Sequence, residues 1–116
     1  MRELYYTTEE KAQTYDTTMP LLEAMYGEFK ELSKRKPDAA VSKSKIKITN
    51  RLLEKVRMAL EDSSSLEFLD LLDEDDVPQM SDVTLILSQY VASMEAFKER
   101  HFGYYKKERQ WVIRED

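Results

Sequence analysis

The strongest constraint on the fold is a stripe of apolar side chains in the second half of the sequence. Between Val83 and His101 they recur every three or four residues over about five helical turns. This spacing places them on one face of an α-helix, and Ser81 or Asp82 can cap its first turn. Because such a face must be buried against other elements, the pattern predicts a helix that reaches about Phe102 within a helical bundle.

Two further long segments show helical periodicity. Over about 42–61, the apolar residues fall on one face and the basic residues on the other. Over about 19–35, apolar residues again recur at helical spacing, with Pro20 in the first turn and Pro37 beyond the end. Proline is tolerated at both of those positions. We therefore expect two amphipathic helices that pack against the helix that begins near Val83.

Two shorter helices are predicted from capping signals. Thr7 and Glu10 have the spacing of a capping box, which favours a short helix before Thr17. Ser64 and Glu67 repeat this spacing, and the leucine-rich residues that follow indicate a short helix over 66–76, which ends in four acidic residues.

The tail after Gly103 permits two interpretations. We favour a helical extension; the alternative is a short strand over 110–114 that pairs with residues 4–6. Aromatic side chains gather at both ends of the chain, and a small terminal core is favoured over an interface. They are Tyr5, Tyr6, Tyr15, Phe102, Tyr104, Tyr105 and Trp111. The expected fold class is thus all-α: a single domain over 1–116, a bundle of four to five helices, with a short two-stranded pairing of the termini as the alternative ending.

The composition excludes several kinds of chemistry. The chain has two Gly, one His and no Cys, so a Gly-rich phosphate loop, a disulfide framework and a cysteine nucleophile are excluded. His101 ends the apolar stripe, and we interpret it as a packed or surface residue; a catalytic or metal-binding role is the less favoured alternative. We expect a non-enzymatic protein with no catalytic or metal-binding residue, no cofactor and no small-molecule substrate.

The expected location is the cytoplasm. No apolar run approaches the roughly 20 residues of a membrane-spanning helix, and the first ten residues lack the apolar core of a signal peptide. We therefore expect no association with a membrane.

Charge is strongly segregated along the chain, although the net charge is only −5. Residues 34–57 carry nine basic side chains and two acids, a net charge of +7. Residues 58–97 carry ten acids and no Lys or Arg. Each block favours contact with a surface of opposite charge, which is either the other block of the chain or a surface of another macromolecule.

The basic block forms a predicted contact surface. Lys43, Lys47, Arg51 and Lys55 step by four along one face of the 42–61 helix, and we group Arg57 with them. A protein partner is favoured over nucleic acid for this face, and a merely solvated face is the alternative to both. For nucleic acid, phosphate contacts would dominate, since only Asn50 and Arg51 could read bases.

The acidic block offers the second predicted contact, at Asp73, Glu74, Asp75 and Asp76. The sequence does not fit an EF-hand loop, because Pro78 stands where that loop needs Gly. We favour a solvated corner or a contact for a basic partner over weak cation binding.

These observations predict a protein that binds another macromolecule through segregated basic and acidic surfaces, as an adaptor, a regulator or an inhibitor. If the two charge blocks lie side by side, their charges largely cancel within one molecule. If they lie at opposite ends, self-association into a homodimer becomes attractive. The alternative function is a helical nucleic-acid-binding protein that uses the 42–61 face.

Overall fold

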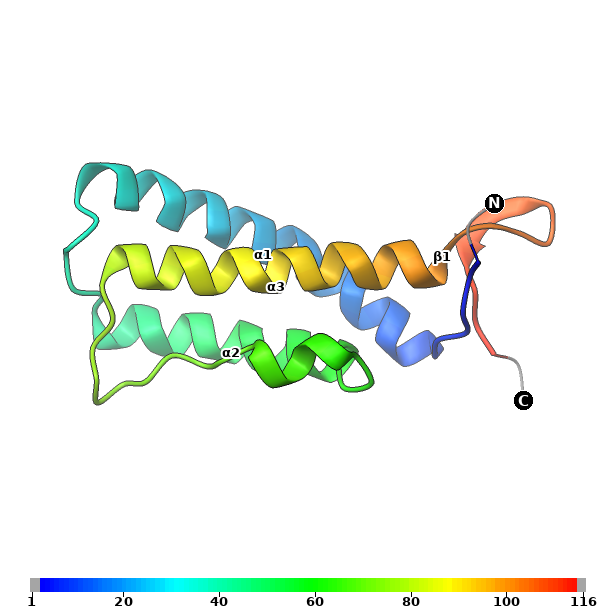
Figure 1. Ribbon diagram of the computed structural model, residues 1–116, viewed down its shortest axis with the longest axis horizontal. Coiled ribbons are helices and arrows are strands. Elements are labelled where there is room, and N and C mark those ends of the chain that lie inside the picture. The colour runs from blue at the N-terminus through cyan, green and yellow to red at the C-terminus, as the bar shows by residue number, and fades with distance from the viewer. Residues whose placement is uncertain (1–2, 115–116) are drawn as a thin grey trace.

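The computed structural model describes residues 3–114. They form an elongated body of about 49 × 24 × 21 Å (Figure 1). In chain order the elements are α1 (Glu9–Arg35), α2 (Lys43–Ala59), the 3-10 helix η1 (Ser64–Phe68), α3 (Met80–His101), β1 (Phe102–Tyr105) and β2 (Glu108–Trp111). The fold is therefore mainly helical, as predicted, but it has three α-helices and an antiparallel hairpin, not four to five helices.

The helices α2 and α3 lie where the apolar periodicity predicted them. Both pack against α1, and the three together enclose the core. Its fully buried side chains come from all three helices, because each presents one apolar stripe to the others. They include Leu22, Ile46, Leu53, Leu87, Tyr90 and Met94.

The single helix α1 replaces the two N-terminal helices expected from the sequence. Thr8 caps it, and its side-chain oxygen accepts a hydrogen bond from the Lys11 backbone at 3.1 Å. Pro20 lies inside the helix and not in its first turn, although proline removes one backbone hydrogen bond. The helix continues through Pro20 because buried side chains on both sides, from Tyr15 to Phe29, form one packed stripe.

The segment after η1 is not helical, so the expected helix over 66–76 is wrong. Leu69 and Leu72 are buried, while side chains of other elements bind the backbone around them. The Arg57 guanidinium donates to the Leu69 carbonyl, and the Tyr90 hydroxyl donates to the Asp70 carbonyl at 2.9 Å. These bonds satisfy carbonyl groups that a helix would have paired internally.

The chain after α3 turns back as a hairpin, so the favoured helical extension is wrong. Strands β1 and β2 pair antiparallel, with Phe102 opposite Trp111. The Trp111 ring lies 5.2 Å from the Tyr15 ring and 5.8 Å from the Phe97 ring, measured between centroids. A continued helix would carry Trp111 about 15 Å beyond the end of α3, so burial of this side chain explains the turn.

Segments near the two ends of the described chain meet, as the alternative ending anticipated. Thr7 forms a parallel bridge with Ile113, and its N–H donates to the Val112 carbonyl at 2.9 Å. The strand partner of β2 is β1, however, and not the N-terminal segment. The terminal aromatic core is confirmed for Tyr15 and Trp111. Of the helices in the described part of the chain, none is both long and apolar enough to cross a membrane.

Candidate functional site

The predicted basic face lies on the outside of α2. Lys43, Lys47, Arg51 and Lys55 are all exposed. Within the described residues, none of the four has a carboxylate within 4.0 Å. Their spacing of four residues separates neighbouring cations by about 6 Å along the helix. The face therefore presents a row of charges that the rest of the described chain leaves uncompensated.

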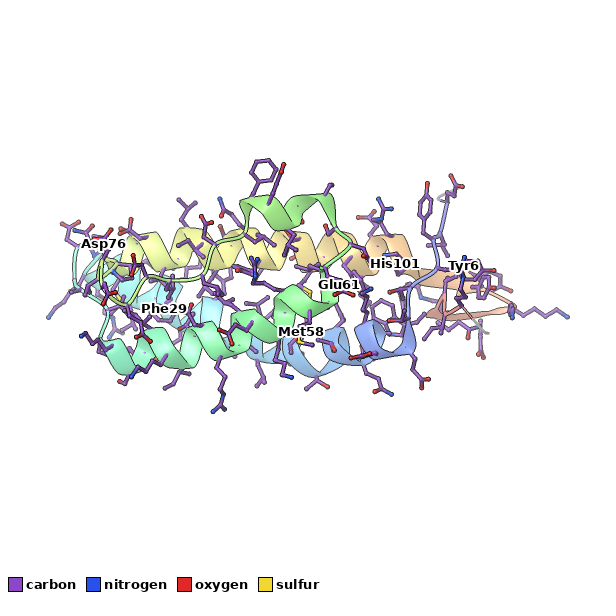
Figure 2. All side chains as sticks on the ribbon, turned by 90° about the horizontal axis from the view of Figure 1, so that it is seen from below. Tyr6, Phe29, Met58, Glu61, Asp76 and His101 are labelled. Atoms are coloured by element: carbon purple, nitrogen blue, oxygen red, sulfur yellow. The ribbon has the colours of Figure 1, made fainter. Side chains whose placement is uncertain are left out.

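Two large apolar side chains share this face. Ile48 is 62% exposed, and it precedes Arg51 by three residues and Lys55 by seven, which places it on the same side of the helix. Met58 is 51% exposed and follows the same two residues by seven and three (Figure 2). The face thus combines positive charge with apolar area, which is a common composition of protein interfaces.

Arg57 does not belong to this face. It is half-buried, and its guanidinium donates to the Leu69 carbonyl on the inner side of α2. The next four-residue step of the basic face after Lys55 falls on Ala59. Arg57 shares the charge of that face but not its position on the helix. Arg57 therefore fixes the extended segment to α2.

The acidic corner is a loop at the same end of the molecule as the start of α2. Asp73, Asp75 and Asp76 are exposed, and Asp73 accepts a hydrogen bond from the Asp75 backbone at 2.8 Å. Glu74 is half-buried. The segment just before α2 is tied to the end of this loop, since the Val41 N–H donates to the Pro78 carbonyl at 3.0 Å, and both lie at one end of the molecule (Figure 1).

The placement of the acidic and basic residues bears on self-association and on metal binding. The acidic corner lies at the same end of the molecule as the start of the basic face, and self-association of the chain stays a prediction. Over residues 3–114, no group of three or more potential ligands among His, Asp and Glu is placed to hold a metal ion.

His101 fastens the N-terminal segment to the end of α3. Its Nδ1 lies 2.8 Å from the Tyr5 carbonyl oxygen, and its ring centroid lies 4.7 Å from that of Phe97. One face of the side chain is thus packed and one nitrogen is engaged by the backbone. The contacts agree with the interpretation of His101 as a packed residue.

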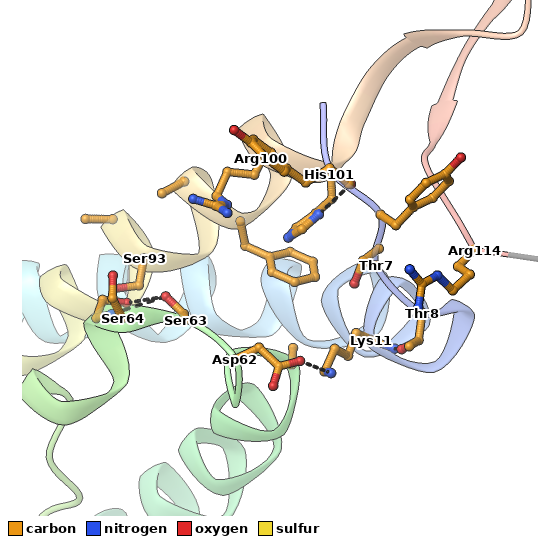
Figure 3. A pocket seen from close by; sticks show the side chains of 17 residues that line it. Thr7, Thr8, Lys11, Asp62, Ser63, Ser64, Ser93, Arg100, His101 and Arg114 are labelled. Carbon is orange, nitrogen blue, oxygen red and sulfur yellow. Dashed lines mark hydrogen bonds and ion pairs between the residues drawn. The ribbon is translucent and has the colours of Figure 1, made fainter. Parts of the chain in front are cut away.

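The sequence did not reveal a groove of about 950 Å³ near this histidine (Figure 3). Its floor is the stripe of small residues on α3, Ala92, Ser93 and Ala96. Its walls are the residues 5–8 on one side and 62–65 on the other. The sequence analysis noted Tyr5 and Tyr6 as terminal aromatic residues, but the segments that complete the groove are distant along the chain.

Charge is unevenly compensated within this groove. Lys11 pairs with Asp62 at 2.6 Å and with Glu61 at 3.0 Å. The hydrogen bond that Lys11 donates to Asp62 is the main reason that the pKa of Lys11 is raised; burial opposes this rise, and the hydrogen bond to Glu61 adds to it. Arg100 and Arg114, by contrast, lie over aromatic rings and have no carboxylate within 4.0 Å among the described residues.

The described surface thus carries three charged features: the basic face of α2, the acidic corner and the groove at the end of α3. No protein-family model, curated protein or solved structure matches this chain. The case for a function therefore rests on the chemistry of these three surfaces.

Proposed function

We propose that the chain is a cytoplasmic, non-enzymatic binding protein of the adaptor, regulatory or inhibitor type, and that the outer face of α2 binds an acidic surface of another protein. The support is the row of exposed cations at Lys43, Lys47, Arg51 and Lys55, which lacks carboxylate partners within the described chain. Opposite charge on a partner would steer the encounter and set its orientation.

The observation that carries a protein partner over nucleic acid is the exposure of Ile48. A branched apolar side chain, 62% exposed between cations, gains free energy when a partner's apolar surface covers it. A phosphate backbone offers no such surface, and the cations alone would serve it.

The position of Asn50 also disfavours base readout. Its side-chain amide donates to the Leu72 carbonyl and its oxygen accepts from the Leu72 N–H, each at 2.8 Å. Of the two residues that could have read bases, only Arg51 remains on the exposed face. Nucleic-acid binding through phosphate contacts is therefore the second candidate function.

Site-specific photo-crosslinking tests the protein partner. A photo-reactive residue at position 48, introduced into the full chain in its native cells, is expected to give one discrete adduct. The same residue at the exposed position 13 of α1 serves as the control. Charge reversal by Lys47→Glu with Arg51→Glu should remove the adduct, while Lys106→Glu with Lys107→Glu, at the far end of the molecule, should leave it.

The result that would overturn this function is an adduct pattern at position 48 that equals the pattern at position 13. Fluorescence anisotropy with a short mixed-sequence duplex tests the second candidate. If duplex binding falls steeply with salt, is abolished by Lys47→Glu with Arg51→Glu, and no protein adduct forms, nucleic acid replaces the protein partner.

A further inference from the structure

The groove at the end of α3 contains two guanidinium groups that lie over tyrosine rings. The Arg100 Cζ lies 4.7 Å from the centre of the Tyr5 ring, and the Arg114 Cζ lies 5.9 Å from that of Tyr6. Neither has a carboxylate within 4.0 Å in the part of the chain that the structure describes. Lys11, in the same groove, is already neutralised by Glu61 and Asp62.

Stacking prepares these guanidiniums for binding. A guanidinium held over an aromatic ring loses rotational freedom before a ligand arrives, while the N–H groups at its edge remain able to donate. Such an edge matches the two oxygens of a carboxylate. Tyr5 is itself held, because its N–H donates to the Arg100 carbonyl at 2.8 Å and its carbonyl contacts His101.

The two cations occupy separate positions in the groove. Figure 3 shows Arg100 on the α3 side and Arg114 on the other side of His101, beside Thr8. A compact anion is best held by donors that converge on one point. Separated donors instead suit a ligand that carries negative groups at intervals, as an extended acidic peptide does.

The remaining lining also fits a peptide backbone. Ala92, Ser93 and Ala96 form a floor without large side chains, so another backbone can approach α3 closely. The Ser64 hydroxyl on the wall provides a donor and an acceptor for peptide groups, whereas the Ser63 hydroxyl already forms hydrogen bonds with Ser65. The groove is open at the surface, so it can admit a chain that continues at both ends.

We propose that this groove binds an extended acidic peptide segment of a partner protein, with Arg100 and Arg114 each engaging one carboxylate. The site is distinct from the α2 face and does not depend on it. An adaptor of this form would hold two acidic contacts at once, one across a helix face and one in a groove.

Amide chemical-shift mapping on the full chain tests this site. The probe is a tetraglutamate peptide with blocked ends, and tetraglutamine is its neutral match, both at constant ionic strength. Saturable shifts are expected at residues 5–8, 62–65 and 92–101 with tetraglutamate alone. Arg100→Gln with Arg114→Gln should weaken binding by at least about tenfold, because two charge-assisted contacts are lost. Arg100→Gln by itself should weaken it by about threefold or more.

The control is Arg51→Gln with Lys55→Gln, which removes the same charge from α2 and should leave the affinity unchanged. Both groove arginines are exposed, and the spectrum of each variant reports whether the fold is retained. The proposal is overturned if the groove shows no saturable shift, or if the α2 variant weakens binding as much as the groove variant. Larger groove shifts with pyrophosphate than with tetraglutamate would also overturn it, in favour of a phosphate site.

Discussion

The side-chain amide of Asn50, on α2, forms hydrogen bonds with both the carbonyl and the N–H of Leu72. The Nδ2 donates to the Leu72 carbonyl and the Oδ1 accepts from the Leu72 N–H, each at 2.8 Å. A side-chain amide here makes the pair of hydrogen bonds that a neighbouring strand would make. The segment after η1 is thereby held extended along α2, which brings the acidic corner close to the first turn of that helix.

Replacement of Asn50 should therefore destabilise the fold out of proportion to its size. Asn50→Ala leaves the N–H and the carbonyl of Leu72 without partners in a partly buried position, and we expect a loss of about 1–3 kcal/mol in the free energy of unfolding. Urea titration measures this, with exposed Glu54→Ala on the same helix as the control. A loss equal to that of Glu54→Ala would contradict the role of Asn50.

The expected helix over 66–76 shows why the local sequence pattern is a poor guide to this region. Its capping spacing and its leucines are typical of a helix, and a 3-10 turn does form over Ser64–Phe68. What keeps the remainder extended comes from Asn50, Arg57 and Tyr90, which are 12 to 22 residues away along the chain. A pattern read over a few residues contains none of these partners.

The two candidate sites also differ in how far the sequence could predict them. The exposed row from Lys43 to Lys55 was predictable, because helical spacing alone places these side chains on one face. The groove was not, since its lining comes from the N-terminal segment, the end of α2, the end of α3 and Arg114. Only the turn of the hairpin brings Arg114 back to the tyrosines that precede α1.

The buried hydroxyl of Tyr90 predicts a loss of stability in alkali. Burial raises the pKa of Tyr90 above its ordinary value of 10.0, although hydrogen bonding to Arg57 and the charge of Arg57 oppose this. Below pH 10 both the folded and the unfolded chain keep the Tyr90 proton, so Tyr90 contributes no pH dependence to the free energy of unfolding. Above pH 10 the unfolded chain loses the proton while the folded chain retains it, so the free energy of unfolding should fall as pH rises.

Tyr90→Phe should reduce this alkaline decline and also cost about 1 kcal/mol at neutral pH, because the Asp70 carbonyl loses its donor. Burial also raises the pKa of Tyr15, so part of the decline should persist in the variant. Denaturant titrations on either side of pH 10 measure both effects. Exposed Tyr104→Phe is the matched control, and an identical decline in wild type and Tyr90→Phe would refute the assignment.

The hairpin turn contains a strain that one substitution should relieve. Lys106 and Lys107 have φ values of 51° and 75°, in the left-handed region where side chains cost about 1 kcal/mol or more. Turns with both central residues in this region favour Gly at the second position. Lys107→Gly should therefore raise the free energy of unfolding by about 0.5–1 kcal/mol. Fluorescence of Trp111, which lies on β2, follows the unfolding transition. Lys107→Val should lower the free energy of unfolding.

The contact between His101 and Tyr5 predicts a local effect on the joined termini. His101→Leu keeps an apolar side chain against Phe97 but removes the nitrogen that lies 2.8 Å from the Tyr5 carbonyl. Loss of one hydrogen bond of about 1 kcal/mol should raise amide exchange at Thr7 by about fivefold. Exchange at the buried Leu53 and Leu87 should not change, because opening of the termini need not disturb the core of the bundle. Unchanged protection from exchange at Thr7 would show that His101 acts by packing alone. An equal loss of protection at Thr7, Leu53 and Leu87 would show that the terminal segments and the core unfold as one unit.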